Sequence, residues 1–250
     1  MNNPTTNSKK YFQVHGIVMI IVWIFLSSTA AIIARYFKTS WGSKFICGKA
    51  AWYTIHRFVM SLSVILTMIA FLFVLVALQG NWVSSDEDVK HYAHSITGAI
   101  VISFAFFQPF LALFRCDPGT RYRFIFDYLH AFIGVSALLL SIVTLFFATY
   151  FKFFEGKEGA RIIMIIWTIW IVFIYMAFEI IRRYFTMRNG NVGYTNVDIS
   201  NKRVDDDDDS FAASISSTRE TSEQKIKNVL LALHILIAAI LSIWFSSLVQ

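Results

Sequence analysis

The stretch HSITGAIVISFAFFQPFLALFRCDPGTRYRFIFDYLHAFIG, residues 94–134, contains two apolar runs joined by a short basic loop. Near the start of each run a histidine is followed four residues later by a glycine, as His94 with Gly98 and His130 with Gly134. Positions i and i+4 lie on the same face of a helix. The glycine therefore leaves a gap beside the imidazole, where a flat group could lie against bare backbone. The stretch predicts part of a ligand site, provided that other segments supply partners for the two histidines.

The composition of the chain is typical of a membrane protein. Of its 250 residues, 56% are hydrophobic and 15% are charged, whereas soluble domains carry about 25% charged residues. The charges are absent from long apolar runs, each of about 20 residues or more, which is enough to cross a hydrocarbon core of about 30 Å. The pattern predicts an all-α, polytopic membrane helix bundle with six transmembrane helices. The expected spans are residues 12–35, 51–78, 92–114, 125–150, 161–182 and 228–249.

The positive charge of the chain indicates its orientation and not nucleic-acid binding. The formal net charge is +6, and the Lys and Arg residues lie in short loops beside the apolar runs, where they set topology. The loops after the first, third and fifth spans are basic, and the loop after the second is acidic. We therefore expect an extracytoplasmic N-terminus, in the plasma membrane or an endomembrane. The lipid bilayer is an expected partner, and no nucleic acid is.

The chain is expected to divide into four regions. The first apolar run is too long for a signal peptide, so we expect an uncleaved signal anchor. A late segment is rich in Asn, Ser, Thr and Asp and lacks periodic apolar residues, which predicts disorder. Its five consecutive aspartates are either a solvated segment or a partner-docking element. The regions are an extracytoplasmic N-terminal tail (1–11), a transmembrane domain (12–185), a disordered acidic cytosolic linker (186–227) and a sixth transmembrane helix (228–250).

Four of the six histidines share one position relative to the spans. His15, His56, His94 and His130 each lie within one or two turns of the start of spans one to four. An imidazole inside a membrane costs free energy unless it has a partner. Because successive spans run in opposite directions, His15 and His94 share a depth near the outer surface, and His56 and His130 share one near the cytosolic surface. A four-helix core then predicts two bis-histidine sites.

The ligand set favours iron with imidazole on both axial positions, which is suited to electron transfer and not to oxygen activation. The two iron planes are expected to lie roughly 15–20 Å apart. A zinc site would need three or four N or S ligands at one depth, and a proton relay would need mid-span carboxylates. His91 either edges the outer site or is a plain surface histidine, and His234 is expected to be a packed interhelical residue. Asp127 is either an acceptor for His130 or a partner of a loop arginine.

Several segments together resemble the cytochrome b561 family. HGIVMIIVW (15–23) followed by ARYFK (34–38) resembles its first core helix, and WYTIHR (52–57) resembles its second. The segment of His94 and Gly98 with the Gln-Pro pair at 108–109 resembles the third core helix of the family. The segment from Arg123 through His130 resembles the fourth. The likeness covers about residues 12–182 and is strongest to the transmembrane domain of DOMON-associated, ferric-chelate-reductase-like members. The chain departs from the family pattern at SSTA (27–30), at RCDP after the third helix and at FIFD before His130, and no DOMON domain is expected before span one.

The resemblance implies a function as well as a fold. By it, two haem b groups bind in the four-helix core, one between His15 and His94 and one between His56 and His130, with Gly98 beside the first pair. Gly134 takes the corresponding place beside His130. The implied activity is that of a transmembrane ascorbate-dependent ferric reductase, which passes electrons from cytosolic ascorbate to an extracytoplasmic ferric chelate or monodehydroascorbate. A flavin-linked reductase is disfavoured, because no Gly-rich dinucleotide fingerprint occurs.

Ascorbate is a monoanion, so its site should be cationic and should adjoin the inner histidine pair. The candidate residues are Arg121, Arg57, Arg123, Arg35 and Lys49. A homodimer is a further expected assembly. The competing hypothesis is a non-enzymatic membrane scaffold or receptor-like protein that signals through the acidic linker. The two cysteines, Cys47 and Cys116, fall in loops expected in the cytosol and are interpreted as free thiols.

Overall fold

The structure is a computed structural model of the whole chain. It describes residues 6–41, 44–84, 88–114, 120–200 and 207–249, and within them the side chains of 7–41, 44–84, 88–114, 120–188 and 222–249. Within these ranges the protein is built almost entirely of helices. The helices are α1 (Thr6–Ile20), η1 (Ile21–Ser27), α2 (Ser28–Tyr36), α3 (Ala51–Ala77), α4 (Val89–Leu113), α5 (Arg123–Ala148), η2 (Lys152–Phe154), α6 (Gly159–Ser200) and α7 (Asp207–Ser247), and a short hairpin of β1 (Phe45–Ile46) and β2 (Lys49–Ala50) precedes α3.

Six helical segments of the described chain are long and apolar enough to cross a membrane. They are Asn7–Tyr36, Ala51–Ala77, Val89–Leu113, Arg123–Ala148, Gly159–Arg188 and Ser222–Ser247. Helices are the expected solution in lipid, because each satisfies its backbone hydrogen bonds internally. The predicted all-α bundle with six spans is therefore confirmed, with the ends displaced by a few residues.

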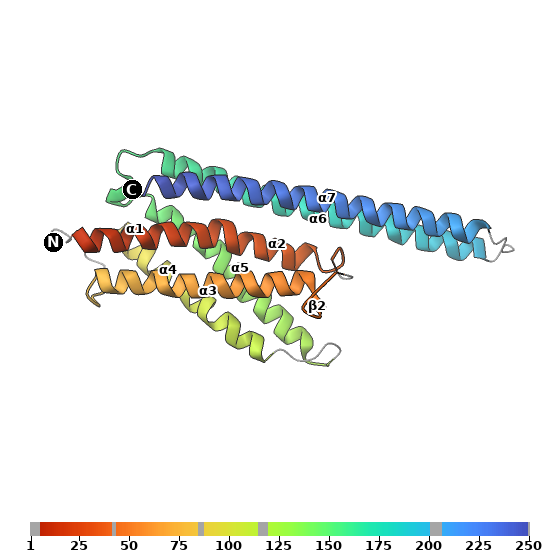
Figure 1. Cartoon of the computed structure of the whole chain (residues 1–250), viewed down its shortest axis with the longest axis horizontal. Coiled ribbons are helices and arrows are strands. Elements are labelled where there is room, and N and C mark those ends of the chain that lie inside the picture. The colour runs from red at the N-terminus through yellow and green to blue at the C-terminus, as the bar shows by residue number, and fades with distance from the viewer. Residues whose placement is uncertain (1–5, 42–43, 85–87, 115–119, 201–206, 250) are drawn as a thin grey trace.

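The helices are arranged as neighbouring antiparallel pairs (Figure 1). The first span packs along α3, α4 packs along α5, and α6 and α7 form a hairpin that lies against the first span. Helix α1 begins and α7 ends at the same end of the bundle in Figure 1, where Gln13 Nε2 donates to the Val249 carbonyl (3.2 Å). Short loops between α3 and α4 and between α4 and α5 explain why these helices run in alternating directions.

A π-helical turn, η1, interrupts the first span between α1 and α2. The wider turn shifts the face that the helix presents, and the carbonyl of Ile24 accepts from Ser28 Oγ (2.6 Å). Ser28 Oγ also lies 3.1 Å from Nε2 of the fully buried His234, whose Nδ1 accepts from Trp170 Nε1 (3.3 Å). These bonds join α7 and α6 to the first span. His234 is the packed interhelical residue that the sequence predicts.

The region after the fifth span differs from the sequence-based expectation. Helix α6 continues to Ser200 and α7 begins at Asp207, so the backbone of residues 186–200 and 207–227 is helical where a disordered linker was expected. In Figure 1 the two helices continue as a long hairpin beyond the rest of the bundle. The whole aspartate run lies outside the residues whose side chains are described. The functional division of the chain into four regions stays a prediction.

Candidate functional site

The four histidines near the starts of spans one to four form two pairs. The ring centroids of His15 on α1 and His94 on α4 are 6.4 Å apart, with the ring planes at 76°. The centroids of His56 on α3 and His130 on α5 are 6.3 Å apart, with the planes at 78°. The pairs join the first span with the third and the second with the fourth, which is the pairing that the alternating topology predicts.

The separation of the rings matches that of two imidazoles on one metal ion. With metal–nitrogen bonds of about 2.0 Å and ring atoms about 1.1 Å from the ring centre, the centroids of two rings on opposite sides of the metal would be about 6.2 Å apart. Direct edge-to-face contact of two rings covers the same range of distances. The distance fits both arrangements, and the hydrogen bonds of the rings favour the metal-binding one.

Backbone carbonyls hold the second ring nitrogen of three histidines. Nδ1 lies 3.0 Å from the Ala70 carbonyl in His15, from the Thr144 carbonyl in His94 and from the Ala30 carbonyl in His56. A carbonyl can only accept, so Nδ1 carries the proton and Nε2 keeps its lone pair. This is the arrangement typical of metal-binding histidines, in which one nitrogen is fixed by an acceptor and the other is left to bind metal.

The same spacing recurs along the helices. In α3, Ala70 follows His56 by fourteen residues, and in α5, Thr144 follows His130 by fourteen. Each of these helices thus carries one histidine and, near its other end, the carbonyl that holds a histidine of the other pair. At about 1.5 Å per residue the two pairs lie about 21 Å apart along the helix axes, somewhat more than the sequence-based estimate. Two separate layers therefore exist within one four-helix core.

Gln108 extends this pattern to α4; the sequence analysis noted it only within the Gln-Pro pair and assigned it no contact with a histidine. It follows His94 by fourteen residues and donates from Nε2 to the backbone carbonyl of His130 (3.0 Å). Gln108 directly precedes Pro109, which lies inside α4. A proline has no backbone N–H to donate to the carbonyl one turn earlier in the helix. The fourteen-residue spacing from a candidate ligand histidine is the signal that could have identified Gln108.

The two predicted glycines lie where α4 and α5 meet. A Cβ atom at Gly98 would be 3.6 Å from Thr144 Cγ2, and a Cβ atom at Gly134 would be 3.3 Å from Gln108 Nε2. Each glycine therefore adjoins the residue that hydrogen bonds a histidine, and lets the opposite helix come close. Side chains of that helix occupy the space beside them. A direct contact of the glycines with a flat group stays a prediction.

An aromatic side chain links His91 to the first pair. The ring of Phe151 stacks on His91 (centroids 4.1 Å, planes 5°) and meets the edge of His94 (4.9 Å). Nδ1 of His91 lies 3.3 Å from an oxygen of Asp88. The backbone N–H of Lys90, with a smaller effect of His91, holds the pKa of Asp88 below its usual value. His91 thus edges the His15/His94 layer, which is one of the two positions expected for it.

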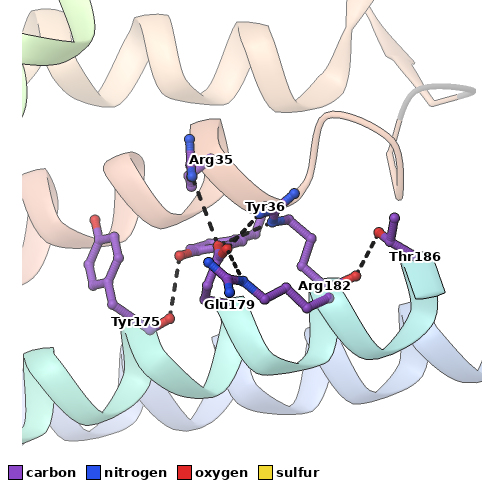
Figure 2. A network of polar contacts seen from close by, with 7 residues as sticks. Arg35, Tyr36, Tyr175, Glu179, Arg182 and Thr186 are labelled. Atoms are coloured by element: carbon purple, nitrogen blue, oxygen red, sulfur yellow. Dashed lines mark hydrogen bonds and ion pairs between the residues drawn. The ribbon is translucent and has the colours of Figure 1, made fainter.

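The five basic candidates for an anion site have different surroundings. Arg35 lies 3.9 Å from Glu179, which also pairs with Arg182 and Arg183. Figure 2 shows this network, with Arg35 and Arg182 approaching the carboxylate from different helices. The Arg35 guanidinium is therefore part of a contact between α2 and α6. We conclude that it is a weaker candidate for binding a soluble anion than the sequence suggested.

Arg123 is held beside the His56/His130 layer. It donates to Asp127 (3.0 Å) and lies 5.5 Å from the centre of the Phe126 ring, which stacks on His130 (5.4 Å, 18°). Asp127 is therefore the partner of a loop arginine, one of its two expected roles. Arg121 is exposed just before α5.

Lys49 and Arg57 line one surface pocket of about 420 Å³ together with Tyr53 and Thr54. The pocket lies beside the β1–β2 hairpin, whose turn residues Cys47 and Gly48 have φ of 51° and 72°. Positive φ at both turn positions is typical of a tight two-residue hairpin. This turn brings Lys49 to the start of α3, two residues before Ala51 and near Arg57. Cys47 is an exposed free thiol, as expected, whereas Cys116 lies outside the described residues.

Six membrane-spanning helices with paired imidazoles inside a four-helix core define a class of protein, the transmembrane haem proteins that transport electrons. The family model for eukaryotic cytochrome b561 matches residues 14–155. The chain belongs to this family, and the match covers all four paired histidines. The family binds haem b, and the spacing and hydrogen bonds of the histidine pairs fit that group.

Curated relatives carry the name of one branch of the family. The chain is 38% identical over 142 residues to the putative ferric-chelate reductase 1 homolog of Drosophila melanogaster, covering 57% of this chain and 21% of the relative. It is 32% identical over 142 residues to human ferric-chelate reductase 1, covering 56% and 23%. The chain thus spans less than a quarter of the length of these relatives. No solved structure matches it.

Proposed function

We propose that the chain carries electrons across a membrane, from ascorbate on the cytosolic side to a ferric chelate or monodehydroascorbate on the other. Two haem b groups would be held by His15 with His94 and by His56 with His130. The observation that supports this best is the pair of imidazole layers, with centroid separations of 6.4 and 6.3 Å and with ring N–H groups fixed by carbonyls. The membership of the cytochrome b561 family supports the same reaction class.

The side chains of the two layers have three tasks in this proposal. The Nε2 atoms would hold the haem iron, and a bound haem would supply one-electron chemistry there. The carbonyls of Ala30, Ala70 and Thr144 fix the ring orientations through Nδ1. The apolar helices keep water and ions away from the region between the layers.

The donor site is proposed at the pocket of Lys49 and Arg57, with Arg121 and Arg123 at its periphery. Ascorbate carries one negative charge, and an opposite charge at 4 Å contributes about 1 kcal/mol in water and more near a protein surface. Arg57 directly follows the ligand candidate His56, and Arg123 contacts Phe126 beside His130. Both cations therefore adjoin the layer proposed to receive electrons. Arg35 has a smaller role here because of its pairing with Glu179.

The direction of transfer is proposed from the distribution of charge. Basic residues cluster at the ends of the spans where the His56/His130 layer lies, and the positive-inside rule assigns that end to the cytosol. The N-terminus and the His15/His94 layer would then face the extracytoplasmic side. The ferric acceptor is proposed because relatives are named ferric-chelate reductases.

The test is electron transfer across a sealed vesicle. The full chain is incorporated into liposomes that enclose ascorbate, and ferricyanide is added outside. For molecules whose His56/His130 layer faces the lumen, we expect haem-dependent reduction of ferricyanide, and we expect His56→Ala to abolish it. Protein-free liposomes give the leak rate. Transfer that does not exceed this leak in vesicles of haem-loaded chain would contradict the proposal.

A further inference from the structure

The strongest feature outside the two histidine layers is a cluster of side chains next to His94. His91 stacks on Phe151 in parallel at 4.1 Å, and Phe151 contacts His94 at 4.9 Å. Three rings in van der Waals contact thus connect a buried ligand candidate with the surface, where the His91 side chain is 36% exposed. Packed atoms conduct electrons better than water-filled gaps of equal length. The stack is therefore a short connection between the layer and a molecule docked at the surface.

The orientation of His91 leaves one nitrogen available. Asp88 lies 3.3 Å from Nδ1, and its other oxygen accepts from the Lys90 backbone N–H at 2.8 Å. With Nδ1–H directed to the carboxylate, Nε2 retains the lone pair. An imidazole fixed in this way can bind a metal ion or accept a hydrogen bond from a ligand of that ion.

Two cations contact Tyr150, the residue before Phe151. Lys90 Nζ is 4.1 Å from the centre of the Tyr150 ring, and the guanidinium of Arg161 is 5.6 Å from it. Arg161 also pairs with Glu158. Within the described ranges, Lys90 has no carboxylate at ion-pair distance from its side chain. Lys90 directly precedes His91 and Tyr150 directly precedes Phe151, so Lys90 and Tyr150 lie close to the aromatic stack along the chain.

We propose that Lys90, His91, Tyr150 and Phe151 form a docking site for small anionic ferric chelates. We call it the outer cluster. His91 would contact the chelate through Nε2, and Lys90 would favour its negative charge, because the charge of Arg161 is already paired with that of Glu158. Phe151 would fix His91 against His94. The inference rests on the proposed function, because the docked iron(III) gains one electron to become iron(II), and that electron comes from ascorbate through the proposed transfer.

Binding can be measured without any electron transfer. Gallium(III) citrate resembles an anionic ferric chelate but is not reduced, and its affinity for the purified full chain is measured by calorimetry at low salt. We expect His91→Ala to weaken binding by about tenfold, because a contact with a charged ligand is lost. Lys90→Ala should weaken it by about fivefold, and added salt should remove that difference. Lys152→Ala is the matched control, because Lys152 is an exposed cation on the same loop, and it should bind as the unchanged chain does.

Oxidation of the reduced chain gives the second readout. The reduced protein is mixed with ferricyanide, an anion, or with hexaammineruthenium(III), a cation. We expect Phe151→Leu and His91→Ala to slow oxidation of the reduced chain by ferricyanide. Lys90→Ala should slow oxidation by ferricyanide but not oxidation by the ruthenium complex. His91→Phe keeps the stack without Nε2, and it should lose gallium citrate binding while remaining folded. Equal binding by the chain and its His91 variants would overturn the docking site, as would equal slowing of both oxidants by Lys90→Ala. A chain that lacks haem but binds gallium citrate at His91 would instead reject the proposed function alone.

Discussion

The assignment of histidines to two separate layers is tested by removing them singly and in pairs. The variants are His15→Ala, His15→Ala with His94→Ala, and His15→Ala with His56→Ala. His15 and His94 are 6.4 Å apart by ring centroids, whereas the two layers are about 21 Å apart along the helices. Sites in contact act as one unit, and sites more than about 10 Å apart act independently.

This geometry fixes the expected haem content of each variant. Loss of His15 should remove one of two low-spin haem signals, and further loss of His94 should remove nothing more, because both residues serve the same site. Loss of His15 with His56 should remove both signals. His91→Gln is the control, because this histidine belongs to neither pair, and both signals should remain.

The assay is the low-spin haem absorbance per purified chain, normalised to protein by amino-acid analysis. The variants are purified from cells supplied with haem, and their helix content is checked by circular dichroism. A within-pair double variant that loses both signals would refute the pairing, as would an across-pair double variant that keeps one.

Three further predictions concern residues around the layers. Replacing His234 by Ala removes the acceptor of Trp170 Nε1 and the partner of Ser28. Thermal unfolding should show that the free energy of unfolding falls by about 1–2 kcal/mol, without loss of haem. An unchanged melting temperature would argue against the interhelical network. Arg57→Ala should raise the ascorbate concentration for half-maximal haem reduction, and this difference should shrink in high salt. Arg35→Ala should leave that concentration unchanged. A larger effect of Arg35→Ala than of Arg57→Ala would move the donor site to the Glu179 network. The pKa of Asp88 is lowered mainly by the Lys90 N–H, so its stabilisation of the α4 start is present above the ordinary carboxyl pKa of 3.8 and is lost as the pH falls through the lowered value. The protection of the amides at the start of α4, relative to their intrinsic exchange rates, should therefore fall only at that acidic end, and a loss of protection near neutral pH would contradict the assignment.

The pairing of the histidines could be predicted from the sequence because depth in a membrane is readable from spacing. Each of His15, His56, His94 and His130 lies near the start of an apolar span, and alternation of the spans then assigns partners. The lengths of the apolar spans and the basic loops between them predict the six-helix fold. No knowledge of side-chain contacts was needed for either result, since lipid restricts the chain to helices.

The groups that orient the histidines could not be predicted in the same way. Ala30, Ala70 and Thr144 contribute backbone carbonyls, which every residue has, so residue type carries no signal. Their use depends on the axial register of neighbouring helices, which the π-helical turn in the first span also alters.

Loop side chains showed a second limit of sequence reasoning. Arg35 and Arg57 have the same charge and both flank a span, but only the structure shows that Glu179 pairs with Arg35 while Arg57 lines a pocket. Phe151 was missed because a phenylalanine beside a span is ordinary in a chain that is 17% aromatic. Its position against His94 follows from the turn after α5, which the sequence does not specify.

The central claim is that each chain holds two haem b groups, each between two histidines. The most direct measurement is the ratio of haem to chain in the purified protein, together with its reduced-minus-oxidised absorbance spectrum. The account predicts two haems per chain and a low-spin b-type spectrum on addition of ascorbate. A chain that folds in cells supplied with haem but is purified without it, or with a single haem that survives loss of either histidine pair, would contradict the account.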